Sequence, residues 1–210
     1  MDNILIIGAH YDDAELGVGG TAAKLAQKGK NVYKITLTDN ETAFSQMNVY
    51  VDALESVRQS QRACQVLGIK EITDFKPVPC NTLTYSTHMM QRIEEVIYNY
   101  AIDTVFMHFA NDINQDHVAA SQLCLTAARH CNNIYQYQSN GYIINQYEPT
   151  LFVDISDYIE LKREALAQYE GGHDRFNRLF TTTIERNHIW GYANKVEYAE
   201  GFHVIKSIIK

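Results

Sequence analysis

The sequence has few of the features that mark secreted, membrane-embedded or nucleic-acid-binding proteins. It contains only four cysteines, and none of them form a Cys-x-x-Cys pair. A chain of 210 residues can bury a sizeable core without disulfides, so we expect reduced thiols and a cytoplasmic protein. No apolar run approaches the roughly 20 residues of a transmembrane helix. The start, Met1-Asp2-Asn3, has no basic segment ahead of an apolar stretch, so we expect no signal peptide.

Positive charge and proline are also scarce. The chain has 18 Lys and Arg against 25 Asp and Glu, which gives a net charge of -7. This balance argues against nucleic acid or an anionic membrane as the main partner, because phosphate binding needs a basic surface. The chain has only three prolines, no internal repeat and no Gly/Ser-rich linker. We therefore expect residues 1–210 to form a single domain. The sequence leaves open whether the protein forms a homo-oligomer.

Apolar runs and helical periodicities alternate along the first 130 residues. They predict strands at 4–7, 31–37, 71–75 and 104–109, and helices at 16–28, 51–67, 86–100 and 116–130. Further on, we expect a strand at 150–155, a helix at 159–169 and an edge strand at 202–208. The alternation predicts an α/β fold, a three-layer sandwich with a mostly parallel central sheet. In the common strand order 3-2-1-4-5, the loops after strands one and four flank the ligand-binding switch point.

The loop after the first predicted strand carries the first group of chemically active residues, in the sequence AHYDDAELGVGG. His10 and Asp13 are three residues apart and can converge on one ion, while Asp12 stands to one side. Two other interpretations compete. Asp12 or Asp13 could cap the following helix. The glycines could form a dinucleotide-binding turn, but their spacing is not G-x-G-x-x-G and the two carboxylates would repel a pyrophosphate.

The loop after the fourth predicted strand carries the second group, in the sequence HFANDINQDH. His117 begins a helix there and could reach His10 and Asp13 across the switch point. Taken alone, this histidine is more often structural. Two histidines and one carboxylate match the protein ligands of a catalytic Zn²⁺, and Fe²⁺ suits the same set. A metal at such a site lowers the pKa of bound water to about 7, and Asp12 could then act as general base.

These motifs resemble a known family, the LmbE-like (PIG-L) deacetylases. GAHYDDAELGVGGT is similar to the family's AHPDD-x-x-LG-x-GG, and NDINQDH to its H-x-D-H motif. A helix ending in VLGI and a YAEGF segment near the C-terminus extend the likeness over nearly the whole chain. The resemblance implies a Rossmann-like fold and zinc-dependent hydrolysis of N-acetyl groups, mostly from molecules that contain N-acetylglucosamine.

The resemblance also assigns roles to individual residues. It implies that His10, Asp13 and His117 bind the metal and that Asp12 is the general base. It further implies that Asp116 orients a metal ligand. Arg129 stands where many members have an arginine, although a structural salt bridge explains it equally well.

Two positions depart from the family pattern. Tyr11 replaces the usual proline, and Asn114 replaces the first histidine of H-x-D-H. An amide can donate a hydrogen bond to an oxyanion but cannot supply a proton near neutral pH. We therefore expect Asp12 to act as both base and acid, with Asn114 as a catalytic hydrogen-bond donor. His173, after two glycines, could hold substrate from the C-terminal segment.

These observations predict a metal-dependent hydrolase that removes an N-acetyl or other N-acyl group from an amino sugar or its conjugate. Substrate specificity is expected from residues 38–50 and from the region after Tyr135. Three alternatives remain: a metal hydrolase of another amide or an ester, a non-catalytic binding protein on the same fold, and a nucleotide-binding Rossmann protein.

Overall fold

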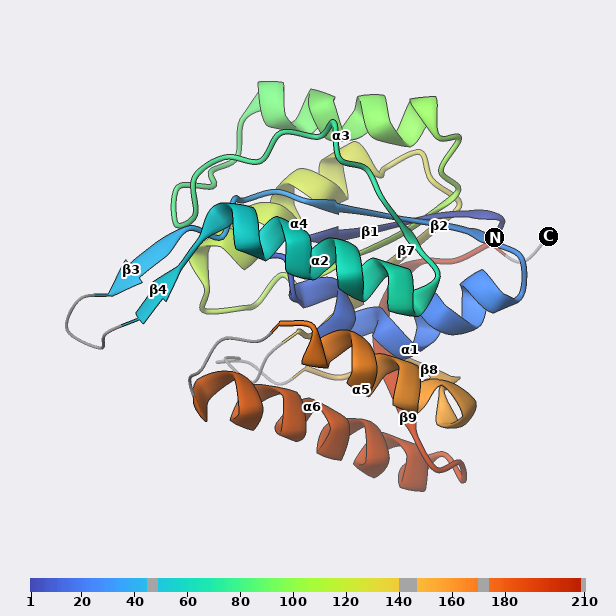
Figure 1. Cartoon of the computed structure of the whole chain (residues 1–210). Helices are drawn as coiled ribbons and strands as arrows, with labels where there is room; N and C mark the ends of the chain where they lie inside the picture. Colours follow the sequence, from blue (N-terminus) through green and yellow to red (C-terminus); the bar gives the residue numbers. More distant parts are fainter. Residues whose placement is uncertain (45–48, 140–146, 170–173, 209–210) are drawn as a thin grey trace.

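A computed structural model describes residues 1–44, 49–139, 147–169 and 174–208. They form a seven-stranded sheet in the order β5-β2-β1-β6-β7-β9-β8, with a separate hairpin of β3 and β4 (Figure 1). Strands β5, β2, β1, β6 and β7 are parallel, while β9 pairs antiparallel with both of its neighbours, β7 and β8. The predicted α/β fold with a mostly parallel sheet between helical layers is confirmed.

The strands are β1 (Asn3–Gly8), β2 (Asn31–Thr36), β3 (Thr42–Phe44), β4 (Val49–Val51), β5 (Lys70–Glu71), β6 (Thr104–His108), β7 (Asn133–Tyr137), β8 (Leu151–Asp154) and β9 (Ala199–Lys206). The helices are α1 (Asp13–Gln27), α2 (Ala53–Leu67), α3 (Thr87–Asn99), α4 (Gln115–Ala127), α5 (Ile159–Ala167) and α6 (Asp174–Ala193), and a 3-10 turn, η2 (Ser156–Tyr158), precedes α5. Among the described residues, no helix is both long and apolar enough to cross a membrane.

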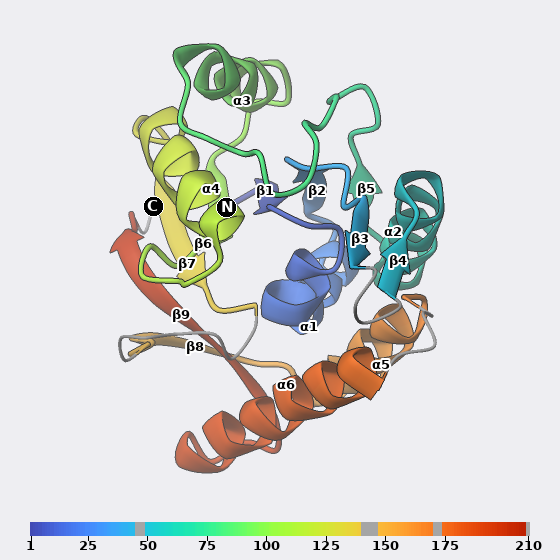
Figure 2. The same ribbon diagram turned by 90° about the vertical axis from the view of Figure 1, so that its left-hand side faces the viewer.

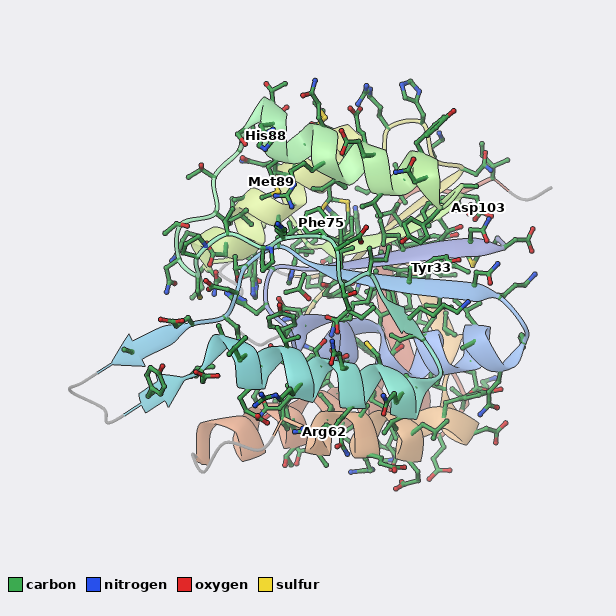
Figure 3. All side chains as sticks on the ribbon, turned by 45° about the horizontal axis from the view of Figure 1, so that its top comes forward. Tyr33, Arg62, Phe75, His88, Met89 and Asp103 are labelled. Carbon is green, nitrogen blue, oxygen red and sulfur yellow. The ribbon has the colours of Figure 1, made fainter. Side chains whose placement is uncertain are left out.

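Helices cover both faces of the sheet, which explains the continuous apolar run of β1. Leu5 and Ile7 face a core formed with α3 and α4, whereas Ile4 and Ile6 face α1, α2 and α5. Figure 2 shows these layers and looks onto the carboxyl ends of the parallel strands. Met89 on α3 belongs to the first core, and His88 is exposed on the outside of the same helix (Figure 3).

Capping residues explain why several helix ends fall close to the predicted positions. The side chain of Asp52 accepts a hydrogen bond from the backbone of Glu55, and that of Ser86 accepts one from Met89. Each of these bonds satisfies a backbone donor that has no partner within the first helical turn. Helix α2 ends at Gly68, whose φ of 70° is the left-handed conformation that glycine adopts readily.

The sheet differs from the prediction at β7 and β9. The fifth parallel strand is β7, which the sequence analysis missed because NIYQY mixes polar and apolar residues. Its buried Asn133 and Gln136 donate hydrogen bonds to Thr104 and Ser121, which makes their burial tolerable. The strand at 202–208 is not an edge strand, because β9 lies between β7 and β8.

The remaining differences concern lengths and missing elements. Strand β5 has two residues instead of the five predicted for 71–75. Helix α6 was not predicted, since its sequence contains a run of three threonines and a glycine, which are poor helix formers. The segment 38–50, expected to be a loop, contains β3 and the first two residues of β4.

Two glycines of α1 allow this helix to approach its neighbours closely. A Cβ at Gly17 would lie 2.1 Å from Cδ2 of Tyr137, and one at Gly20 would lie 2.7 Å from Cδ1 of Ile155. Real side-chain carbons do not come so near, so both positions need glycine. The glycine-rich segment that suggested a dinucleotide turn thus serves to pack helix against sheet.

The C-terminal strand is tied to α1 by a buried carboxylate. Glu200 on β9 accepts hydrogen bonds from the backbone nitrogens of Gly20 (3.0 Å) and Thr21 (2.7 Å). It also pairs with Lys162 of α5, whose Nζ is 2.6 Å from Glu200 Oε1. Both side chains are fully buried, so the pair is a fixed part of the core.

Candidate metal centre

The turn after β1 is closed by Asp13. Its Oδ2 accepts a hydrogen bond of 2.7 Å from the backbone nitrogen of His10, and a Cβ at Gly8 would lie 2.6 Å from the carbonyl oxygen of His10. Asp12 occupies the N-cap position of α1, but its side chain makes no capping hydrogen bond to any residue that the structure describes. The capping interpretation of Asp12 is therefore wrong.

A buried lysine, Lys34, also holds this turn in place. Lys34 Nζ donates to the carbonyl oxygen of Tyr11 (2.5 Å) and to Glu15 Oε1 (2.8 Å). Tyr169 Oη donates to the same Tyr11 carbonyl at 2.7 Å. Hydrogen bonds thus hold the turn at the position where a proline is usual in the resembled family.

The loop after β6 presents the first turn of α4 to this site. Asn114 caps the helix, since its Oδ1 accepts hydrogen bonds from the backbone nitrogens of Asp116 (2.9 Å) and His117 (3.4 Å). The backbone nitrogen of Asn114 in turn donates to Asp112 Oδ1 at 2.9 Å. The cap fixes the start of α4, and with it the position of His117.

The structure brings His10, Asp13 and His117 together. His10 Nδ1 lies 3.1 Å from His117 Nε2 and 3.5 Å from Asp13 Oδ2, and His117 Nε2 lies 3.4 Å from Asp13 Oδ1. Ligands at about 2.0–2.2 Å from one tetrahedral zinc ion are separated by similar distances. The three residues, which are the predicted ligands, can therefore surround one divalent cation.

Each histidine of the cluster is held by a carboxylate through its other ring nitrogen. Asp112 Oδ2 is 2.9 Å from His117 Nδ1, and Asp116 Oδ2 is 3.4 Å from His10 Nε2. Metal-binding histidines usually have such partners, which fix the ring and its tautomer. Asp116 thus stands where an orienting residue is expected. Asp112 was not singled out from the sequence, although it lies in the second motif.

His108 completes the buried part of the cluster. Its ring stacks on that of His117 with centroids 4.1 Å apart, and its Nε2 is 3.0 Å from Asp13 Oδ2. Burial lowers the pKa of His108, which favours the neutral ring. His108 thus packs against the ring of His117 and contacts the carboxylate of Asp13.

The electrostatics of the cluster suit a cation. Burial acts to lower the pKa of His10, but hydrogen bonds to Asp116 and Asp13 outweigh it and raise that pKa well above its usual value. Burial acts to raise the pKa of Asp13, but the charge of His117 and the hydrogen bonds to His10 and His108 hold it well below its usual value. The site therefore stabilises positive charge, and a metal ion can replace the proton on His10.

Asp12 has different electrostatics from its neighbour. Burial and the negative charge of Asp13 raise the pKa of Asp12 to about 6, against a weaker opposing effect of His10. Two adjacent carboxylates with pKa values pushed apart are typical of sites that use one of them for acid–base chemistry.

Two other predicted site residues do not belong to this cluster as the structure describes it. Arg129 lies just beyond the end of α4, at the opposite end of that helix from His117. It pairs with Glu94 and donates to the carbonyl oxygen of Thr126 at 2.7 Å. The structure thus contains the salt bridge that was the structural alternative for Arg129. His173 lies outside the described residues.

The fold and the site define an α/β protein with a His/His/Asp cluster, suited to a divalent cation, at the switch point of its sheet. Residues 5–128, more than half of the chain, match the family PIG-L, described as GlcNAc-PI de-N-acetylase. The chain belongs to this family, which confirms the resemblance found in its motifs.

Named relatives carry deacetylase descriptions. The chain is 29% identical over 174 residues to the uncharacterized deacetylase YaiS of Escherichia coli K12, covering 80% of this chain and 90% of that protein. It is 27% identical over 190 residues to diacetylchitobiose deacetylase of Thermococcus kodakarensis, covering 81% of this chain and 70% of the relative.

Solved structures share the fold at lower identity. They include the conserved protein TT1542 from Thermus thermophilus, with TM-score 0.83, 21% identity and coverage of 100% and 97% of the two chains. N,N'-diacetylchitobiose deacetylase from Pyrococcus horikoshii has TM-score 0.79, 20% identity and coverage of 97% and 84%. GalB, the 4-carboxy-2-hydroxymuconate hydratase from Pseudomonas putida, has TM-score 0.86, 18% identity and coverage of 100% and 98%. A hydratase and a deacetylase thus share this fold, so the fold alone does not fix the reaction.

Proposed function

We propose that this protein is a zinc-dependent hydrolase that removes the acetyl group from the nitrogen of an N-acetylated amino sugar. One observation carries the proposal: His10, Asp13 and His117 converge within ligand distance of one another, with the carboxylate of Asp12 next to them in the chain. Membership of the PIG-L family and the deacetylase names of the relatives support the choice of reaction.

The donor set fits the proposed ion. Two imidazoles and a carboxylate are typical protein ligands of a catalytic zinc and leave a position open, although Fe²⁺ suits the same set. When bound, such an ion lowers the pKa of water and polarises a carbonyl oxygen. Asp112 and Asp116 hold the imidazoles so that one nitrogen of each stays directed at the shared centre.

Asp12 is the proposed general base and acid. A nearby cation lowers the raised pKa of Asp12, so its carboxylate is ionised and able to accept a proton near neutral pH. It takes this proton from the attacking water and returns it to the departing amine, whose C–N bond breaks as acetate forms. Asn114 Oδ1 is engaged in the helix cap, which leaves its amide nitrogen as the group to donate to the oxyanion.

The proposed substrates are N-acetylglucosamine and its short oligomers, free or conjugated, as suggested by the relative named diacetylchitobiose deacetylase. The test is an assay of free amine and acetate release on these sugars after chelation and readdition of Zn²⁺ or Fe²⁺. We expect both products in equal amounts, with activity lost on chelation and restored by metal. A protein that binds metal but releases no amine from any N-acylated sugar or other amide would contradict the proposal.

A hydratase is a second candidate, because the GalB hydratase has the same fold at TM-score 0.86. Water addition to an unsaturated tricarboxylate such as 4-carboxy-2-hydroxymuconate would bleach its ultraviolet absorption and release no amine. Assaying the same metal-loaded preparation on both kinds of substrate decides between the two reactions.

A further inference from the structure

A second group of metal-binding side chains surrounds the other nitrogen of His10. It comprises His10, Cys80 and Asp116, and one donor atom from each lies within 4.8 Å of the other two. Asp116 Oδ2 is 3.4 Å from His10 Nε2 and 3.9 Å from Cys80 Sγ. A tetrahedral zinc ion with one sulfur ligand separates its ligand atoms by about 3.3–3.6 Å, so small side-chain movements would complete a site here.

Hydrogen bonds hold the loop of Cys80 against α4. The backbone nitrogen of Cys80 donates to Asp39 Oδ1 at 2.9 Å, and that of Asn81 donates to Asp116 Oδ2 at 2.7 Å. Gln115 Nε2 donates to Asn81 Oδ1 at 2.9 Å. The backbone is therefore already in place, and only the thiol has to turn toward the ion.

Cys80 differs from the other thiols of the chain. It is partly exposed, whereas the remaining cysteines, Cys64, Cys124 and Cys131, are buried. Of the four, only Cys80 joins a candidate metal group among the described residues. Thiolate is a soft ligand that selects zinc and related thiophilic ions over Mg²⁺ or Ca²⁺.

We propose that His10, Cys80 and Asp116 form a second site for a thiophilic divalent cation such as Zn²⁺ or Cd²⁺. His10 bridges this site to the hydrolytic one, with Nδ1 directed at the first ion and Nε2 at the second. The inference rests on the proposed function for the first ion and adds a second ion that the reaction does not need.

Protons and charges balance at such a bridged pair. Binding of the second cation releases two protons, one from the Cys80 thiol and one from the remaining N–H of His10. The imidazolate, the thiolate and the carboxylates of Asp13 and Asp116 then supply four negative charges against the four positive charges of two divalent ions. The second ion also takes Asp116 away from its hydrogen bond to His10. Because this contact orients a ligand of the first ion, we expect excess cation to inhibit the enzyme.

Cadmium titration of the full-length apoprotein tests the proposal, with ion stoichiometry from equilibrium dialysis and the ultraviolet thiolate-to-cadmium absorption band as readouts. The key variant is Cys80→Ser. The matched control is Cys131→Ser, which alters a buried thiol that precedes β7 and donates to the carbonyl oxygen of Ile102 at 3.7 Å. We expect two ions in the wild type and in Cys131→Ser, with the band appearing alongside the second ion. We expect one ion and no band in Cys80→Ser.

The outcomes separate this inference from the proposed function. A second ion or a thiolate band that persists in Cys80→Ser overturns the second site. One ion in the wild type also overturns it, and if the band is absent, the hydrolytic site is left standing. Absence of any bound ion contradicts both.

Inhibition by excess zinc gives an independent readout on the metal-loaded enzyme. Losing an outer partner of a metal ligand already weakens metal binding about 10–100-fold, so losing a ligand should raise the inhibitory zinc concentration by at least about tenfold. Cys80→Ser should keep the uninhibited turnover of the wild type. Equal zinc inhibition of both proteins would argue against the site.

Discussion

Asp112 Oδ2 lies 2.9 Å from Nδ1 of His117, on the side of the ring away from Asp13. This contact fixes the ring so that Nε2 faces the candidate metal position. Replacing Asp112 by asparagine removes the charge that supports the imidazole while keeping a similar shape. We expect zinc affinity to fall about 10–100-fold, measured by competition with a chromophoric chelator. Asp74→Asn, at an exposed position, is the control and should bind zinc as the wild type does. Unchanged affinity in Asp112→Asn would show that the contact has no role in metal binding.

Asp12 and Asn114 should differ sharply in their effect on turnover. Asp12→Asn removes the proposed base and acid, so we expect kcat to fall by at least about 100-fold while zinc binding is retained. Asn114→Ala should cost far less kcat, and about 1 kcal/mol of stability through loss of the helix cap. Asn114→Asp keeps a capping oxygen and removes the amide donor, so it isolates the contribution of that donor. Comparable losses of kcat from Asp12→Asn and Asn114→Asp would contradict the separate roles proposed for the two residues.

The raised pKa of Asp12 predicts a pH dependence. The base works only when ionised, so kcat/KM of the enzyme loaded with one zinc ion should fall with decreasing pH, with a midpoint at or below about 6. The midpoint shifts downward from that value because a bound cation favours the carboxylate. The measurement is a pH profile between weakly acidic and neutral pH, with zinc occupancy checked at each point. If the residual activity of Asp12→Asn fell with the same midpoint at low pH, the pH dependence would belong to another group.

Burial of Lys34 makes it sensitive to substitution. It is fully buried and donates to Glu15, so Lys34→Met leaves a buried carboxylate without its partner. We expect a loss of about 3–5 kcal/mol in the free energy of unfolding. Lys34→Met combined with Glu15→Gln should recover part of this loss, since the uncompensated charge is gone. Urea denaturation of the two variants measures both effects, and equal stabilities would disprove the pairing argument.

Gly17 and Gly19 offer a matched pair on one helix. A Cβ at Gly17 would meet the Tyr137 ring at 2.1 Å, whereas one at Gly19 would meet Cγ of Lys162 at 3.2 Å. We expect Gly17→Ala to lose about 1–3 kcal/mol by overpacking. Gly19→Ala should lose clearly less, because a contact of 3.2 Å requires a much smaller displacement than one of 2.1 Å. Thermal unfolding of both variants checks the order, and the reverse order would mean that α1 sits differently on the sheet.

The parts of the fold and site that follow from local patterns were predictable. The apolar run of β1, the turn with His10 and Asp13, and the helix that begins near His117 are each visible within a few residues. Strand β7 was missed because its buried amides find partners on β6 and α4, and no local pattern shows such partners.

The other unpredicted features of the site depend on contacts between residues far apart in the sequence or on side-chain orientation. Cys80 and Asp116 are 36 positions apart and meet only because a loop folds over the start of α4. Asp112 was visible in its motif, yet its role depends on which ring nitrogen it faces. Family position left two roles open for Arg129, and its ion pair with Glu94 becomes visible only in the folded chain.

The internal position of β9 has a consequence for the order in which the molecule can assemble. Among the described residues, strand β8 joins the sheet only through β9, and Glu200 of β9 accepts hydrogen bonds from two backbone nitrogens in the middle of α1. During synthesis, α1 therefore lacks these partners until residue 206 has emerged from the ribosome. The position of the helix that carries Asp13 thus depends on a side chain close to the other end of the described chain.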